Sequence, residues 1–147
     1  MGGAPGYVPS AGIRGWLSGT PPVLALAAVE EGVRLVEEAG IEPIREKGIA
    51  LTELAIELAD DRLAERGVRV ASPRDCARRG AHVALAHPDA RRLCEQLGDR
   101  NVIVDFRAPD VIRLGLSPLS TRFVEVWDAI DVLAELLVVA ETVGALA

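Results

Sequence analysis

The spacing of apolar residues changes near Gly67, and this change constrains the fold more than any other feature of the chain. Before Gly67, apolar residues recur every three or four positions over residues 22–40 and 43–67, which is typical of amphipathic helices. After Gly67 the apolar residues form short runs, which indicates strands. The expected strands are residues 68–71, 81–86, 101–106 and 111–116.

Two further helices are expected in the second half of the chain. One opens at Pro88 and closes at Gly98, and a final helix is capped by Ser120 or Thr121. The predicted core stripe of the final helix is Phe123, Trp127, Ile130, Leu133 and Leu137. This order of elements predicts a small α+β fold, in which a mainly antiparallel sheet is covered by helices on one face.

The first residues differ from the rest of the chain. Residues 1–22 are rich in glycine and proline, so we expect an extended arm or loop that connects to something preceding it. Residues 23–147 are expected to form one small domain. Because the helix over 43–67 is apolar on two sides, it needs two neighbours, one of which could lie outside the chain.

The composition excludes several kinds of partner. The 147 residues include 22 acidic and 16 basic side chains, with no basic stripe that carries aromatic residues, which argues against nucleic acid. No apolar run reaches the length of a membrane span, so a cytoplasmic protein is expected. Cys76 and Cys94 lie in no metal or redox motif, and His82 and His87 are poorly spaced for a shared ion, so no metal site is predicted.

Arg113 is the first candidate for binding chemistry. In a strand over 111–116, Ile112 and Leu114 share one face, while Arg113 points to the other face together with Gly115. The missing side chain at Gly115 leaves room for a ligand, and a guanidinium can bind a carboxylate through two hydrogen bonds. The alternative is a solvated arginine, or one paired with Asp105 or Asp110.

The segment Gly19-Thr20-Pro21-Pro22 is a weaker candidate. It precedes a helix, so backbone amides and the Thr20 hydroxyl could meet an anion at the positive end of the helix dipole. Threonine and proline are also common at helix starts for reasons of capping alone, and that alternative stays open.

Three stretches, taken together, resemble the C-terminal part of the kynureninase family. They are GYVPSAGIRGWLSGTPPVLALAAVEEG, RRGAHVALAHPDA and VIVDFRAPDVIRLGLSPLSTRFVEVWDAI. The resemblance implies the small C-terminal domain of a fold-type-I enzyme that depends on pyridoxal phosphate. It also implies a homodimer in the cytoplasm. Enzymes of the family hydrolyse L-kynurenine to anthranilate and L-alanine, or its 3-hydroxy derivative to 3-hydroxyanthranilate and L-alanine. This reaction belongs to tryptophan breakdown and NAD synthesis.

The resemblance also implies roles for single residues. Arg113 matches the arginine that binds the α-carboxylate of the amino-acid substrate. Gly19 and Thr20 match the loop that approaches the cofactor phosphate and the aromatic end of the substrate near the dimer interface. Neither role follows from spacing or composition.

The chain departs from the family in one respect. Fold-type-I enzymes hold the cofactor as an imine on a lysine of their large domain, and the single lysine here, Lys47, lies near the start of a helix that the family uses for structure. We therefore expect no catalytic residue in this chain, and no activity without a large domain that a longer protein or a separate chain would supply. The alternatives are the small domain of a class-V aminotransferase or cysteine desulfurase relative, and a non-catalytic binding or assembly module.

Overall fold

The computed structural model describes the backbone of residues 6, 8, 10–17 and 19–144, and the side chains of these residues up to 139. The chain divides into two compact units, Met1–Glu38 and Ala39–Ala147. Among the helices over residues 19–144, none combines the length and the apolar character needed to cross a bilayer.

The first unit contains a short 3-10 helix, Gly12–Trp16, and nearly all of helix α1, Val23–Ala39. The bounds of α1 agree with the helix predicted from the apolar spacing. Arg34 on this helix forms ion pairs with Glu30 and Glu31 at 2.6 Å. None of the residues of α1 is buried, so its apolar stripe is exposed to solvent.

The second unit contains a four-stranded sheet in which every neighbouring pair is antiparallel. The strands are β1 (Arg69–Val70), β2 (His82–Ala86), β3 (Asp105–Arg107) and β4 (Val111–Gly115). Their spatial order is β1-β2-β4-β3. The predicted antiparallel sheet is confirmed.

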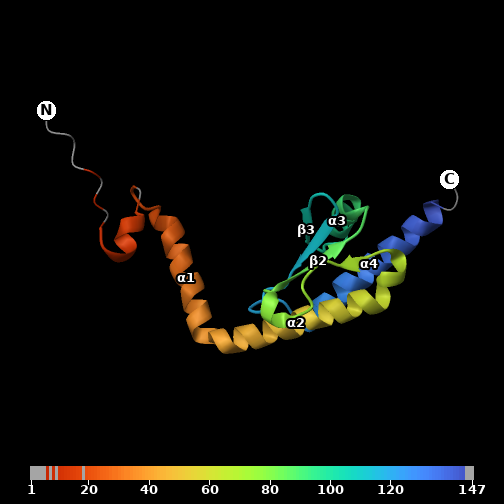
Figure 1. Cartoon of the computed structure of the whole chain (residues 1–147), viewed down its shortest axis with the longest axis horizontal. Helices are drawn as coiled ribbons and strands as arrows, with labels where there is room; N and C mark the ends of the chain where they lie inside the picture. Colours follow the sequence, from red (N-terminus) through yellow and green to blue (C-terminus); the bar gives the residue numbers. More distant parts are fainter. Residues whose placement is uncertain (1–5, 7, 9, 18, 145–147) are drawn as a thin grey trace. The chain divides into compact units, whose positions relative to one another are not determined.

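Three helices cover one face of this sheet: α2 (Ile41–Arg62), α3 (Ala90–Asp99) and α4 (Phe123–Gly144). Figure 1 shows α2 and α4 side by side, and these two helices contact each other along the core. The face of the sheet that they cover carries apolar side chains from both central strands, because β2 and β4 are in register with Val83 opposite Leu114 and Leu85 opposite Ile112. Burial of these side chains drives the helices onto this face.

The core stripe of α4 differs from the predicted one. Ile130, Leu133 and Leu137 are buried as expected, but Phe123 and Trp127 are 46% and 49% exposed. Val126 is buried in their place. Trp127 follows Val126 by one position, which turns it about 100° around the helix to the edge of the stripe. Arg62 of α2 lies over its ring there, 4.9 Å from the ring centre.

The start of α4 also differs from the expectation. The helix begins at Phe123 rather than directly after Ser120 or Thr121. The carboxylate of Glu125 accepts a hydrogen bond of 2.7 Å from the backbone N–H of Arg122. An acidic side chain in the first turn therefore satisfies a free backbone donor at this end of the helix.

Both apolar stripes predicted for this helix are buried in part by the chain itself. Leu51 and Leu58 of one stripe are buried, and so are Ile56 and Leu63 of the other. The helix packs against α4 on one side and against β1 and β2 on the other. Ile44 and Leu54 of the first stripe and Ile49 of the second are only partly buried, so the expectation of a further neighbour stays a prediction.

Candidate functional site

Arg113 lies in the middle of β4 and projects from the face of the sheet opposite to the one that α2, α3 and α4 cover, which is called the uncovered face below. Two of its neighbours on this face, Ala84 and Gly115, are small. The register places Ala84 of β2 directly opposite Arg113, and His82 opposite Gly115. A side chain built on Gly115 would meet no atom within 4 Å. The predicted orientation of Arg113, away from the core and beside an open position, agrees with the structure.

Asp105 lies opposite Arg113 on the other side, in the edge strand β3. The Arg113 guanidinium donates a hydrogen bond from Nη2 to Oδ2 of Asp105. The same oxygen accepts a hydrogen bond of 3.0 Å from Nε of Arg107 and forms an ion pair with Nη2 of Arg107 at 2.8 Å. Of the two acids considered as partners from the sequence, Asp105 is the one that pairs with Arg113.

This cluster remains accessible and positively charged. The side chains of Arg113 and Asp105 are 39% and 44% exposed. Two guanidinium groups share one carboxylate, which leaves a net charge of +1. Partial desolvation acts to raise the pKa of Asp105, but the hydrogen bonds and charges of Arg107 and Arg113 outweigh it and hold that pKa below its ordinary value. The cluster can therefore bind a further anion without a change of protonation.

Gly19 and Thr20 belong to the first unit, and Arg113 belongs to the second. Gly19 and Thr20 are exposed and form a bend before α1. A side chain built on Gly19 would meet no atom within 4 Å. The first backbone hydrogen bond of α1 runs from the N–H of Leu26 to the carbonyl of Pro22, at 3.0 Å. The segment thus precedes a helix as expected, and its role in binding an anion stays a prediction.

Lys47 lies on α2, which packs on the covered face of the sheet. Arg113 projects from the opposite face. The positive charge of Lys47 acts on Glu125 of α4, where it contributes, after the stronger effects of Arg122, to a lowered pKa of that carboxyl group. The position of Lys47 is therefore unsuited to a role next to Arg113.

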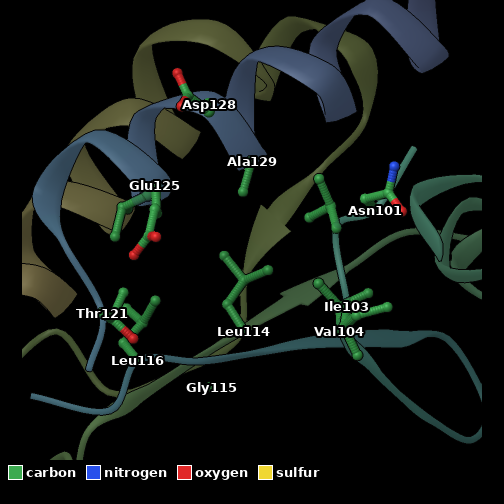
Figure 2. A pocket seen from close by; sticks show the side chains of 12 residues that line it. Asn101, Ile103, Val104, Leu114, Gly115, Leu116, Thr121, Glu125, Asp128 and Ala129 are labelled. Atoms are coloured by element: carbon green, nitrogen blue, oxygen red, sulfur yellow. The ribbon is translucent and has the colours of Figure 1, made fainter. Parts of the chain in front are cut away.

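A pocket of about 380 Å³ lies at the end of the β3–β4 ladder. Residues 101–106 were predicted to form a strand, but only Asp105–Arg107 pairs with β4. Residues 101–104 run apart from β4, and Figure 2 shows Ile103 and Val104 on one side of the resulting hollow, with Leu114 and Leu116 from the β4 side. Glu125 and Asp128 of α4 line it as well. A strand continuous over residues 101–106 would have filled this space, so the apolar pattern gave no sign of the pocket.

The two histidines do not meet at a shared site. His87 accepts a hydrogen bond at Nδ1 from the backbone N–H of Asp89, at 3.1 Å, directly before α3. Within residues 6–139, as far as side chains are described, no group of three or more His, Cys, Asp and Glu side chains is placed to hold a metal ion.

Sequence comparisons find one family. The model of the kynureninase C-terminal domain matches residues 44–133. The kynureninase of Pseudomonas fluorescens is 43% identical over 133 residues, which cover 90% of this chain and 32% of that protein. The kynureninase of Geobacillus thermodenitrificans is 37% identical over 131 residues, which cover 89% of this chain and 31% of that protein. The chain thus spans about a third of the length of these curated relatives.

Comparison with solved structures gives the fold. A cysteine desulfurase from Thermococcus onnurineus NA1 superposes with a TM-score of 0.71 at 19% identity, covering 85% of this chain and 34% of that one. A NifS-like protein gives a TM-score of 0.60 at 20% identity, covering 88% of this chain and 38% of that one. The fold is that of the small domain of fold-type-I pyridoxal-phosphate enzymes, and the sequence matches assign the chain to the kynureninase family, as its C-terminal domain.

Proposed function

We propose that this chain is the substrate-carboxylate-binding domain of a kynureninase, which hydrolyses L-kynurenine or 3-hydroxykynurenine to anthranilate or 3-hydroxyanthranilate and L-alanine. The observation that carries the proposal is the position of Arg113. It projects from the uncovered face of the sheet, beside Gly115 and opposite Ala84, in a chain of this family. Such an enzyme would act in tryptophan breakdown and NAD synthesis in the cytoplasm.

Arg113 would bind the α-carboxylate of the amino-acid substrate. A guanidinium has five N–H donors, and the described residues use only the Nη2 group of Arg113, toward Asp105. The remaining donors can form two parallel hydrogen bonds to a carboxylate, which fixes the orientation of the substrate as well as its charge. The small neighbours Ala84 and Gly115 leave the approach to these donors open.

The described residues do not hold pyridoxal phosphate by themselves. The cofactor supplies an electron sink for the cleavage of bonds in amino acids and is anchored on a lysine. Lys47 is the only lysine of the chain and lies on the covered side of the sheet. We therefore assign the anchoring lysine to a large domain outside this sequence. Gly19 and Thr20 would contribute only backbone N–H groups and a hydroxyl near the cofactor phosphate.

The cysteine desulfurase reading has less support. The likeness to that enzyme is one of fold, at 19% identity, whereas the relatives at 43% and 37% identity are both named kynureninase. Fold alone does not select a reaction. We therefore expect activity on kynurenine and none on cysteine. The active form would be a homodimer of the complete enzyme, or a complex of this chain with a separate large-domain chain.

A hybrid enzyme tests the proposal. In it, the part of the Pseudomonas fluorescens kynureninase that precedes the matched segment is followed by this chain. We expect the hybrid to load pyridoxal phosphate and to release anthranilate from kynurenine. Arg113→Gln should lower kcat/KM about a hundredfold, because it removes charged hydrogen bonds to the substrate.

Arg92→Gln is the matched control, because Arg92 is an exposed arginine of α3 that pairs with Asp89, on the covered side of the sheet. It should leave kcat/KM unchanged. A hybrid that binds the cofactor and forms dimers but does not cleave kynurenine would refute the proposed function. Equal activity of the Arg113→Gln hybrid and its parent would refute the role of Arg113.

A further inference from the structure

Asp105 holds a position that the proposed function does not yet explain. It lies directly across the ladder from Arg113, on the same uncovered face. Its Oδ2 atom accepts hydrogen bonds from both Arg113 and Arg107. The contact with Arg113 joins the edge strand β3 to the neighbouring strand β4.

We propose that Asp105 is a positioning residue, which holds the guanidinium of Arg113 in the orientation that receives the substrate carboxylate. The proposal rests on the proposed function of Arg113. On this open sheet face Ala84 and Gly115 offer the Arg113 side chain little packing to restrict its rotamers. The hydrogen bond from Nη2 to Asp105 supplies that restriction from a rigid element, since Asp105 is itself fixed in the ladder.

Because Arg107 also pairs with Asp105, Asp105 can orient Arg113 without cancelling the positive charge around it. A single carboxylate paired with Arg113 would cancel its charge and weaken the attraction for a second carboxylate. Arg107 supplies a second guanidinium to the same oxygen, at 2.8 Å from Nη2, and the cluster keeps a net charge of +1. The substrate anion thus meets an oriented donor group in a site that remains positive.

The first test uses this chain alone. Nitrogen-15 relaxation of the arginine Nε groups would be measured in the parent and in Asp105→Ala. We expect an ordered Arg113 side chain in the parent, and in the variant a fall of its order parameter below about 0.6, the range of flexible groups. The matched control is Asp110→Ala, which removes an acid from the turn between β3 and β4 and should leave Arg113 ordered. An Arg113 side chain that is equally mobile in parent and variant would refute the positioning role.

The second test uses the hybrid enzyme and separates this proposal from the function of Arg113. Asp105→Ala should raise KM for kynurenine about tenfold, with kcat changed less than threefold. It should also reduce the preference for kynurenine over its α-carboxamide, which lacks the anionic group. In an Arg113→Gln background, Asp105→Ala should have no further effect on KM, since it acts through Arg113.

The outcomes distinguish the two proposals. If Arg113→Gln raises KM and Asp105→Ala leaves both KM and the preference for the carboxylate unchanged, Arg113 binds substrate without help from Asp105. If Arg113→Gln itself leaves KM unchanged, the proposed function of Arg113 fails. If Asp110→Ala raises KM as much as Asp105→Ala, the effect belongs to the whole β3–β4 turn and the positioning role is refuted.

Discussion

In β4, apolar side chains and the charged side chain of Arg113 lie on opposite faces of the sheet. In β4 the residues on either side of Arg113, Ile112 and Leu114, are buried in the core, and Arg113 itself is 39% exposed on the opposite face. Alternation along a strand produces this separation without any special local geometry. The charged cluster can therefore form within one residue of the core without placing an unpaired charge inside it.

The titration of Asp105 can be measured directly. Its pKa is held below the ordinary value of 3.8 despite partial desolvation, mainly by Arg107 and then by Arg113. We expect the carboxyl carbon resonance of Asp105 to titrate below pH 3.8 in the parent chain, and closer to that value in Arg107→Gln. Because the pKa is lowered on folding, the ion pairs favour the folded state above about pH 4, and this contribution is lost as the pH falls through the pKa of the folded state. An Asp105 titration that is unchanged by Arg107→Gln would contradict the assigned cause.

At the scale of elements, α4 illustrates how a helix divides its apolar residues between the core and the surface. Val126, Ile130, Leu133 and Leu137 are buried on one side, whereas Trp127 lies at the edge under Arg62 of α2. Arg62 also pairs with Asp131, one turn further along α4. The contact between α2 and α4 is thus apolar at its centre, and Arg62, Trp127 and Asp131 lie at its margin.

Two truncations on α4 should have different costs. Ile130→Ala should lower the free energy of unfolding by about 3 kcal/mol, because it leaves a cavity among fully buried side chains. Trp127→Ala should cost less, about 1 kcal/mol, because about half of the residue is already exposed and the change removes its contact with Arg62. Urea denaturation of both variants measures the difference. Equal losses would favour the stripe that was predicted from the sequence.

The sequence predicted the type and order of these elements because apolar spacing reports which faces are buried. It predicted the outward direction of Arg113 for the same reason. It left the partner of Arg113 open between Asp105 and Asp110, because that choice depends on the register of β3 against β4. It also failed at residues 101–104, which have strand-like composition but run apart from β4 and line the pocket. Pairing of this kind depends on tertiary contacts, which a local pattern does not contain.

At the scale of the whole molecule, the second unit forms its own core from the sheet and three helices. The face of the sheet with Arg113 lies outside this core. A domain of this construction can supply a binding group to a larger enzyme while its own stability comes from the other side of the sheet.

Lys47 provides a test at this scale. We expect that borohydride reduction of the hybrid enzyme with pyridoxal phosphate labels a lysine of the large domain and not Lys47, which lies on the covered side of the sheet. Peptide mass analysis would locate the label. Lys47→Arg should leave kcat/KM within about twofold, since it keeps the positive charge near Glu125. A stable label on Lys47, together with a loss of activity in Lys47→Arg, would contradict the division of roles between the two domains.

In β4 the side chains alternate between the core and the uncovered face, so the direction of Arg113 and the packing of the core depend on the same register. A deletion of Val111 or Ile112 would turn Leu114 toward water and Arg113 toward the hydrophobic interior, so the outward guanidinium and the core packing would be lost in the same event. Selection against misfolded chains would then also preserve the direction of the guanidinium, even in a lineage where the reaction itself was under weak selection.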